Sequence, residues 1–308
     1  MKHTLVGYTG FVGGNLAESH TFDRLYNSKN ITDAFAEEQD LVVYSGVRAE
    51  KFLAGSDPDG DLAMIKTAME NINNMRPKKL ILISTIDVYD KQDCDEDAVI
   101  DDTNLHPYGK NRLYLEQWVR EAYPTSLIVR LPALFGKGLK KNFLFDMLHP
   151  APSMLKEGVL HTLCETNPWL AEYYLPSASG FYKLSAPEES LQEIHAFFAK
   201  NSFNALSFTD SRASFQFYSL AHLWADIETA LENDLRLLNI VTEPLSVQTI
   251  YTQITGKGFE NILPREPAFY NNYSKYAHLY GGQNGYLTTK ESVLLDIEQF
   301  FEKQVNYT

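Results

Sequence analysis

The stretch TLVGYTGFVGG, residues 4–14, decides the fold class, because a short apolar run leads directly into regularly spaced glycines. Gly7, Gly10 and Gly13 recur at every third position, where a strand would turn tightly into a helix. The first backbone amides of such a helix have no partners within the helix and can hold a pyrophosphate. We therefore predict a dinucleotide site here, with Phe11 and Val12 opening the helix. The alternative is a tight strand-to-helix turn that binds no ligand.

Three further apolar runs follow in the first half of the chain, at residues 40–46, 79–85 and 126–131. The runs are nearly continuous rather than alternating, which is typical of strands buried on both faces of a parallel sheet. Helical patterns fall between them, as in residues 61–72. This order predicts an α/β fold, a Rossmann-like doubly wound parallel sheet with a smaller, mixed substrate-binding lobe.

The domain organisation follows from length and from a change in composition. A chain of 308 residues with 44% hydrophobic residues is long enough for a main domain and a smaller lobe. Past about residue 145 the sequence becomes rich in proline and aromatic residues. The segment LSFTD, residues 206–210, predicts a strand and residues 219–232 predict a helix that return to the sheet. The predicted dinucleotide-binding domain comprises residues 1–145 and about 205–235, and the predicted lobe comprises about 146–204 and 236–308.

Charge and cysteine usage exclude several classes of function. The net charge of -13 opposes binding to nucleic acid or to an anionic membrane. Cys94 and Cys164 lie far apart without CxxC spacing, so neither a disulfide framework nor a metal site is predicted. No apolar run reaches the about 18 residues of a membrane span, and the start lacks a signal-peptide pattern. We therefore expect a soluble cytoplasmic protein.

The end of the second predicted strand bears on the choice of cofactor. A dinucleotide site usually has an acidic residue there, which holds the adenosine ribose. If residues 22–28 form this strand, it ends at Asn27 and Ser28, and Lys29 follows. Because Lys29 can meet a 2'-phosphate and no acid is present, the sequence favours NADP(H) over NAD(H). Asp33 is the alternative acid if the strand lies elsewhere.

A predicted helix carries a tyrosine and an arginine on one face. At about 100° per residue, Arg112 lies about 40° around the helix from Tyr108, whereas Lys110 lies about 200° away. Tyr108 and Arg112 are thus predicted to face the interior and Lys110 to face water. A cation lowers the pKa of a nearby tyrosine and suits it to proton transfer. The alternative is a packed Tyr108 with the Arg112 stem lying along an apolar surface.

The glycine turn, the strand-end Thr85 and the helical Tyr108, in this order, resemble the extended short-chain dehydrogenase/reductases, which include nucleotide-sugar epimerases, dehydratases and reductases. The resemblance covers residues 1–145 and, more weakly, 211–227. It implies that Tyr108 is the proton donor or acceptor at the substrate oxygen, that Thr85 is its hydrogen-bonding companion and that Arg112 is the cation beside it. The family normally has lysine where this chain has Arg112 and often asparagine near Asp61, so the chain departs from the pattern twice.

The residues after Thr85 bear on the type of reaction. Dehydratases of the family carry an Asp-Glu pair there, because removal of water needs both an acid and a base. This chain has Ile86 and Asp87 instead. The resemblance therefore implies an NAD(P)-dependent oxidoreductase that reduces or epimerises a nucleotide-linked sugar. The alternative is a non-catalytic dinucleotide-binding sensor or assembly protein.

The resemblance also implies the remaining contacts. Cofactor contacts are expected from Gly7, Gly10, Phe11, Val12, Gly13, Asn27, Ser28, Lys29, Ser45, Gly46, Arg112, Leu131 and Pro132. Substrate contacts are expected from Asp87, Lys141, Asn142 and Arg212, with Lys140 as a nearby cation. Trp169, Tyr173 and Tyr174 either stack on the base or form the core of the lobe. A homodimer through paired helices is the oligomer that the resemblance suggests.

Overall fold

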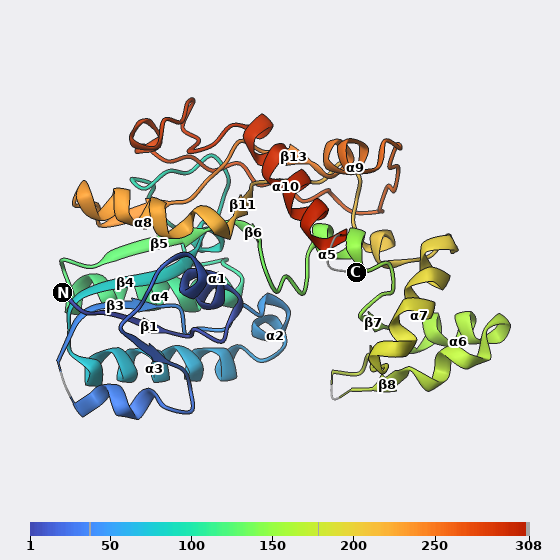
Figure 1. The fold of residues 1–308 in the computed structure, drawn as a ribbon, viewed down its shortest axis with the longest axis horizontal. Coiled ribbons are helices and arrows are strands. Elements are labelled where there is room, and N and C mark those ends of the chain that lie inside the picture. Colours follow the sequence, from blue (N-terminus) through green and yellow to red (C-terminus); the bar gives the residue numbers. More distant parts are fainter. Residues whose placement is uncertain (37, 178, 306–308) are drawn as a thin grey trace. The chain divides into compact units, whose positions relative to one another are not determined.

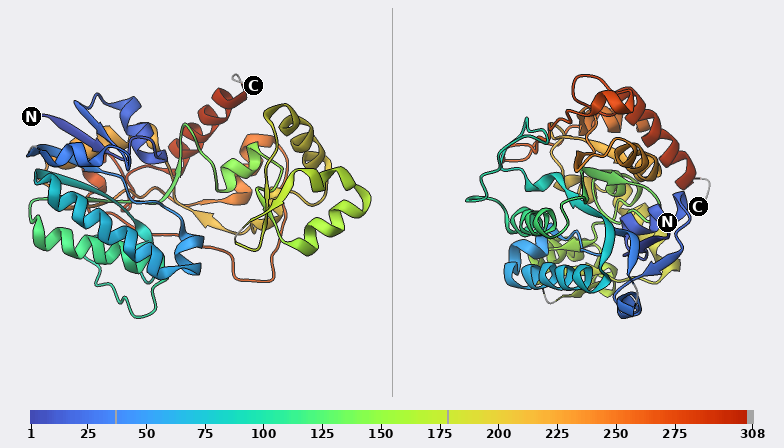
Figure 2. Two further views of the ribbon diagram at one scale, coloured as in Figure 1. Left: turned by 90° about the horizontal axis from the view of Figure 1, so that it is seen from below. Right: turned by 90° about the vertical axis from the view of Figure 1, so that its left-hand side faces the viewer.

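The computed structural model describes residues 1–36, 38–177 and 179–305. These residues form two compact units, and Figures 1 and 2 show their secondary structure. The first unit comprises Met1–Leu139, Ser214–Ser246 and Phe269–Thr308, and the second comprises Lys140–Ala213 and Val247–Ala268.

The first unit is built on a six-stranded sheet in the order β12-β5-β4-β3-β1-β2. All neighbouring strands in it are parallel. The strands are β1 (His3–Val6), β2 (Arg24–Tyr26), β3 (Gln39–Tyr44), β4 (Pro77–Thr85), β5 (Leu127–Leu131) and β12 (Leu237–Asn239). The four apolar runs of the sequence are four of these strands, so the predicted α/β fold with a doubly wound parallel sheet is confirmed.

Successive residues of β1, β3, β4 and β5 enter two apolar cores, one on each face of the sheet. In β3, for example, Val42 belongs to one core, whereas Leu41 and Val43 belong to the other. Four helices supply the opposing surfaces of these cores (Figure 1). One face is covered by α1 (Phe11–Ser19) and α8 (Leu223–Glu232), and the other by α3 (Pro58–Met75) and α4 (Pro107–Ala122). Burial on both faces explains why the runs are continuous rather than alternating.

The start of α4 fixes the place of Tyr108. Pro107 occupies the first turn, where a missing amide proton costs nothing, and its ring presets a helical φ. The Nδ1 atom of His106 accepts a hydrogen bond from the Tyr108 amide at 3.2 Å. Tyr108 therefore lies in the first turn of α4. This turn contacts η2 (Ile86–Val88), the short 3-10 helix that follows β4.

The sheet reverses its order beside β1. The chain passes from β1 outward to β2 and then returns to β3 on the other side of β1. Such a reversal leaves a crevice at the carboxyl ends of the strands, where α/β proteins bind ligands. The Gly7 amide donates to the Tyr26 carbonyl at 2.7 Å, and the Ser45 amide donates to the Val6 carbonyl at 3.0 Å. These bonds tie the ends of three strands together at the reversal.

Two small sheets and the C-terminal helix complete the first unit. β6 (Ala133–Phe135) pairs with β11 (Phe217–Ser219), and β10 (Ser214–Phe215) pairs with β13 (Leu245–Ser246). In α10 (Lys290–Val305), the ring of Phe300 lies 5.7 Å from that of Phe135. This packing places the C-terminal helix with the sheet, whereas the sequence-based division placed residues 236–308 in the smaller lobe.

The second unit has its own small sheet and its own core. Three antiparallel strands, in the order β7-β9-β8, pack with α6, α7 and the 3-10 helix η3 (Pro168–Glu172) around residues such as Leu170, Ile194 and Phe198. Its elements are α5 (Phe143–Leu148), β7 (Met154–Leu155), α6 (Glu157–Thr166), β8 (Tyr174–Pro176), β9 (Tyr182–Leu184), α7 (Glu188–Lys200) and α9 (Val247–Thr255).

One strand predicted for the dinucleotide-binding domain is wrong, and its residues belong to the second unit. Residues 206–210, predicted as a strand, belong largely to the 3-10 helix η4 (Ala205–Phe208). The Oδ1 atom of Asn204 accepts the Leu206 amide at 2.9 Å and thereby caps this helix. A side chain that bonds the backbone ahead of it favours a turn over a strand. In the part of the chain that the structure describes, no helix is both long and apolar enough to cross a membrane.

Candidate functional site

The glycine turn after β1 is shaped by close backbone contacts. Gly7 has a φ of +91°, a conformation that side chains rarely allow. A Cβ on Gly7 would lie 2.6 Å from the Ser45 carbonyl oxygen, and a Cβ on Gly13 would lie 2.2 Å from the Gly7 carbonyl oxygen. A Cβ on Gly10 would approach only the Gly7 carbonyl oxygen, at 3.2 Å. Gly7 and Gly13 are therefore required by the turn itself, whereas Gly10 keeps the entrance to the helix bare.

The helix that follows presents an uncapped positive end. The N-cap residue of α1 is Gly10, which has no side chain that could cap the helix. The first turn of α1 contains no acidic residue. The first amides of a helix lack partners within the helix, and its dipole favours an anion there. The glycines leave a space beside this helix start that a Cβ at Gly10 would partly fill. Such a space fits the pyrophosphate of a dinucleotide.

The segments after β2 and β3 flank this cradle. Behind β2, the Asn27 side chain accepts the Lys29 amide at 2.9 Å, and the Asn27 amide donates to the Asn30 side chain at 2.7 Å. This turn holds no acid, because Asp33 lies further on, exposed in η1 (Ile31–Ala36). Behind β3, the Ser45 hydroxyl donates to the Val6 carbonyl at 2.8 Å. The residues predicted to contact the cofactor here thus share one edge of the sheet.

Tyr108, Thr85 and Arg112 come together in the first unit. Their exposed fractions are 7%, 8% and 4% respectively. Burial raises the pKa of Tyr108, although Arg112 and a hydrogen bond with Thr85 act in the opposite direction. The guanidinium carbon of Arg112 lies 4.0 Å from the centroid of the Tyr108 ring, a favourable cation-π arrangement. Lys110 faces outward, as the helical spacing predicts, with its Nζ 3.8 Å from the Asp102 carboxylate.

The two departures from the family pattern contact each other. Arg112 Nη1 donates to the Asp61 carboxylate, and both side chains are about nineteen-twentieths buried. Arg112 Nη2 donates to the Arg48 carbonyl at 2.6 Å, and Asn111 donates to Asp61 at 2.8 Å. A buried charge without a partner is strongly destabilising. The Asp61 carboxylate therefore provides the counterion for the buried Arg112 guanidinium.

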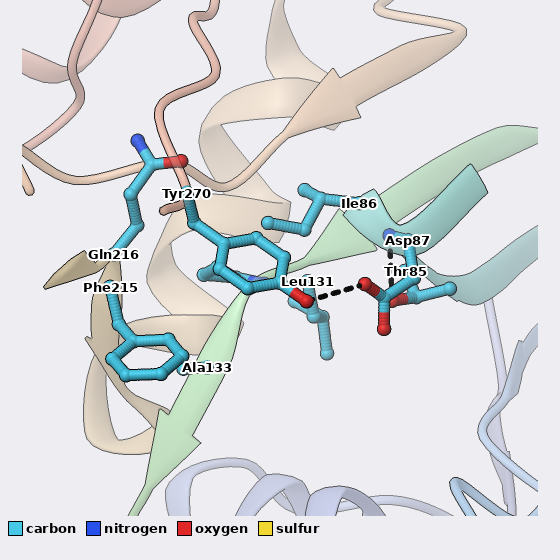
Figure 3. Close-up of a pocket in the computed structure, with 9 residues that line it drawn as sticks. Thr85, Ile86, Asp87, Leu131, Ala133, Phe215, Gln216 and Tyr270 are labelled. Carbon is cyan, nitrogen blue, oxygen red and sulfur yellow. Dashed lines mark hydrogen bonds between the residues drawn. The ribbon is translucent and has the colours of Figure 1, made fainter. Parts of the chain in front are cut away.

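A pocket of about 160 Å³ opens beside Thr85 (Figure 3). Its lining residues are Thr85, Ile86, Asp87, Leu131, Pro132, Ala133, Phe215, Gln216 and Tyr270. The rings of Phe215 and Tyr270 are stacked, with centroids 5.7 Å apart and planes inclined by 23°. Thr85 and Asp87 form a polar edge opposite this aromatic wall. Such a combination suits a ring-sized group that has both an apolar face and oxygen atoms.

Lys51 and Tyr270 are among the residues of this region that were not predicted from the sequence. Lys51, the first residue of α2 (Lys51–Ser56), donates from Nζ to Asp87 Oδ1 at 2.9 Å and to the Tyr270 hydroxyl at 3.2 Å. The Tyr270 hydroxyl also donates to Asp87 Oδ1, at 3.2 Å (Figure 3). Burial lowers the pKa of Lys51, but Asp87 and Tyr270 outweigh this effect and raise it overall. The one sequence signal for Lys51 as a site residue is its position shortly after β3, at the carboxyl edge of the sheet.

The other predicted substrate contacts lie in the second unit. Asn142 caps α5, because its Oδ1 accepts the amides of Leu144 at 3.0 Å and Phe145 at 3.2 Å. Arg212 holds Asp210 with two hydrogen bonds, from Nε at 3.0 Å and from Nη2 at 2.8 Å. Lys141 is exposed at the turn before α5. The contribution of these residues to substrate binding stays a prediction.

The aromatic candidates of the second unit contribute to its core. Tyr174 is 1% exposed, and its hydroxyl donates to the Pro152 carbonyl at 2.7 Å. Trp169 and Tyr173 are partly buried and pack against the same core. These rings were predicted either to stack on the base or to form the core of the lobe. Tyr174 is part of the core, because its buried ring has no face open to a nucleobase.

Comparison with known proteins agrees with this geometry. A family model described as the RmlD substrate binding domain matches residues 6–159, which is half of the chain. The chain belongs to this family. The resemblance to the extended short-chain dehydrogenase/reductases is thereby confirmed. No curated protein matches the sequence.

Solved structures with low sequence identity share the fold. The dTDP-4-dehydrorhamnose reductase from Yersinia enterocolitica is 14% identical, with a TM-score of 0.66 over 97% of this chain and 99% of that one. The UDP-glucuronic acid 4-epimerase from Bacillus cereus is 16% identical, with a TM-score of 0.60 over 99% and 100%. RMD from Pseudomonas aeruginosa, complexed with NADPH, is 14% identical, with a TM-score of 0.59 over 99% and 100%.

The arrangement in this member of the RmlD substrate binding domain family is suited to acid-base chemistry. A buried phenol lies beside a hydroxyl and a guanidinium, at the ligand-binding edge of the sheet. Because burial raises the pKa of Tyr108, the phenol keeps its proton at neutral pH and can donate it to a ligand oxygen.

Proposed function

We propose that this chain is an NAD(P)-dependent oxidoreductase that reduces or epimerises a nucleotide-linked sugar. The observation that carries the proposal is the position of Tyr108, buried beside Thr85 and under the Arg112 guanidinium at the same sheet edge as the glycine cradle. The similar structures support this class of substrate, since they include a dTDP-linked sugar reductase and a UDP-linked sugar epimerase.

The residues present fit a dinucleotide. Gly7, Gly10 and Gly13 would hold its pyrophosphate at the start of α1. The adenosine ribose would lie against Asn27, Ser28 and Lys29, and the remaining contacts would come from Phe11, Val12, Ser45, Gly46, Arg112, Leu131 and Pro132. When bound, the nicotinamide supplies or accepts the hydride. Lys29, in a turn that has no acid, favours NADP(H) over NAD(H).

The buried Tyr108 and its neighbours in the first unit would move the proton. Tyr108 donates its phenolic proton to the substrate carbonyl oxygen as that oxygen becomes a hydroxyl. Thr85 hydrogen-bonds the same oxygen, and the Arg112 charge stabilises the phenolate that forms. Asp87 at the pocket edge would contact the nucleotide-sugar. Lys141, Asn142 and Arg212 are the substrate contacts that we propose for the second unit.

A binding and turnover experiment tests this function against the non-catalytic alternative. Calorimetric titration with NADH and NADPH is followed by a hydride-transfer assay on a panel of dTDP-, UDP-, GDP- and CDP-linked keto-sugars. We expect binding of at least one cofactor and turnover of at least one sugar. Binding without any turnover would favour the sensor or assembly protein, and no binding would contradict both functions.

The finer features of the proposal have separate tests. Lys29→Ala is expected to weaken binding of NADPH and to leave that of NADH unchanged, because only NADPH carries a 2'-phosphate. Equal affinities of the unmodified protein for both cofactors would remove the NADP(H) preference. A homodimer is the proposed oligomer, and sedimentation velocity at several concentrations measures it. The cytoplasmic location stays a prediction.

A further inference from the structure

Each keto-sugar reduction would leave Tyr108 without its phenolic proton, and Arg112 is unable to return it. A lysine at that position can release a proton, whereas a guanidinium stays protonated in proteins. The Arg112 side chain is 5% exposed, and its Nη atoms donate to Asp61 and to the Arg48 carbonyl. The residue in the place of the family lysine is thus neither a proton source nor open to water. This reasoning rests on the proposed function, because only turnover creates the need.

Lys51 has the properties that Arg112 lacks. Its side chain is 46% exposed, so its ammonium group can exchange protons with water. The same Nζ contacts Asp87 at 2.9 Å and the Tyr270 hydroxyl at 3.2 Å, and both of these residues line the pocket. An ammonium group is also a releasable acid, with a pKa that responds to its surroundings.

The contacts of Lys51 lead to the Tyr108 region. Helix α4 approaches η2 so closely that a Cβ on Gly109, the residue after Tyr108, would lie 2.0 Å from the Asp87 carbonyl oxygen. On the other side, the Asp87 amide donates to Thr85 Oγ1 at 3.1 Å. The Asp87 backbone is therefore in contact with both the helix turn that carries Tyr108 and the threonine beside it, and the Asp87 charge acts on the Tyr108 phenol.

The charged and titratable groups that act on Tyr108 and Lys51 are the following. Burial and Arg112 have the largest effects on the pKa of Tyr108, and Asp87 then raises it while Lys51 lowers it. Lys51 itself faces Asp87 and Tyr270. His106 turns its Nδ1 to the Tyr108 amide at 3.2 Å, so this ring bonds the backbone.

We propose that Lys51 returns the proton to Tyr108 after each reduction, with Asp87 and Tyr270 as the intermediate hydrogen-bonding groups. When the substrate carbonyl carbon gains a hydride, its oxygen takes the phenolic proton and leaves a tyrosinate. An N–H bond of Lys51 then breaks, and a proton passes through the Asp87 carboxylate or the Tyr270 hydroxyl to the tyrosinate oxygen. The neutral Lys51 amine recovers a proton from water, so one solvent proton is consumed per turnover. Epimerisation returns its own proton, so this route favours reduction.

Turnover of Lys51 variants tests the route, with a keto-sugar that the unmodified protein reduces as the probe. We expect Lys51→Gln to lower kcat about tenfold or more without raising KM, since general acid-base groups contribute at least this much. Lys51→Arg keeps the charge but releases no proton, so its kcat should stay low. Added methylamine should restore much of the turnover of Lys51→Gln. Lys110→Gln, which changes an exposed lysine on α4, is the matched control and should change kcat less than about twofold.

A second readout needs no substrate. With 3-fluorotyrosine at position 108, fluorine NMR follows ionisation of this phenol in the resting protein. We expect Lys51→Gln to move the ionisation to higher pH, because a positive neighbour is lost, and Lys51→Arg and Lys110→Gln to leave it in place.

The outcomes separate the proton route from the proposed function. If the unmodified protein reduces a keto-sugar and Lys51→Gln does so equally well with an unmoved fluorine titration, the route is wrong and the function stands. Full activity in Lys51→Arg would also overturn it, because a fixed charge would then suffice. If the unmodified protein reduces no keto-sugar, both proposals fail.

Discussion

The pocket beside Thr85 in the first unit and the Asn142 and Arg212 region of the second unit use their polar groups differently. In the pocket, Asp87 and Tyr270 bond to each other at the edge of a ligand-sized space. In the second unit, Asn142 caps α5 and Arg212 donates hydrogen bonds to Asp210. Both regions carry residues that the family resemblance implicates. The difference teaches that a matching residue type becomes a strong site candidate only when its bonds meet at a space for a ligand.

Local geometry explains this difference. Strand ends in an open α/β sheet deliver side chains to a common edge, so a residue such as Thr85 reaches the ligand region by topology alone. Asparagine and paired arginine residues also stabilise helix starts and turns, and a sequence does not distinguish that use from ligand binding. The following predictions test the contrast, beginning with the largest effect.

Tyr108→Phe should remove most turnover, by about 100- to 10,000-fold, because the phenolic proton is lost while the ring is retained. Affinity for the dinucleotide should stay the same, because the glycine turn is untouched. Measurement of kcat and of cofactor binding by calorimetry checks both statements. If the variant were fully active, a group other than Tyr108 would have to be the acid.

Arg112→Leu should lower the free energy of unfolding by about 3–5 kcal/mol, because it leaves the Asp61 carboxylate buried without its cation. Arg112→Lys can still meet Asp61 but loses the bond to the Arg48 carbonyl, and should cost about 1–3 kcal/mol. Urea unfolding of the two variants gives both values. Equal losses would mean that charge pairing is not what stabilises this part of the first unit.

Asp146, in the α5 helix of the second unit, should make stability depend on pH. Burial raises its pKa from 3.8 to about 7. Between these values the unfolded chain has released the proton and the folded chain has not, so stability falls as pH rises and the penalty is complete above about pH 7. Asp146→Asn should therefore stabilise the protein by up to about 4 kcal/mol near pH 8 and hardly at all near pH 4. Unfolding curves at the two pH values measure this, and an equal gain at both would contradict it.

Arg212→Ala should weaken binding of a nucleotide-sugar about ten- to a hundredfold and leave dinucleotide affinity nearly unchanged. Asp210→Asn is the informative companion, because it weakens the grip on Arg212 without removing the cation. Calorimetry with a panel of nucleotide-sugars measures both variants. If neither changes sugar affinity, the pair serves only the fold of the second unit.

Lys110→Ala should have the smallest effect, with turnover within about twofold of the unmodified protein. Lys110 is half exposed, and its carboxylate partner Asp102 is at 3.8 Å. Steady-state kinetics suffice for this test. A large loss would show that the outward face of α4 also takes part in the chemistry.

The sequence predicts the features of this molecule that depend on local patterns. Continuous apolar runs predicted four strands of the sheet, and helical spacing predicted that Tyr108 and Arg112 lie inside while Lys110 lies outside. Residues 206–210 were mistaken for a strand because their apolar pattern conceals the Asn204 cap. Lys51 and Tyr270 could not be paired in advance, because 219 residues separate them and only the folded chain brings them to Asp87.

The Asp61 and Arg112 pair restricts the order in which these two positions can change during evolution. A chain with aspartate at position 61 and lysine at position 112 still joins two opposite charges in the interior. A chain with asparagine at position 61 and arginine at position 112 buries a cation that has no counterion. Of the two single changes that start from the present pair, the one that keeps the aspartate is therefore the less costly. Among relatives that carry one of these two residues, the first combination should be more frequent than the second.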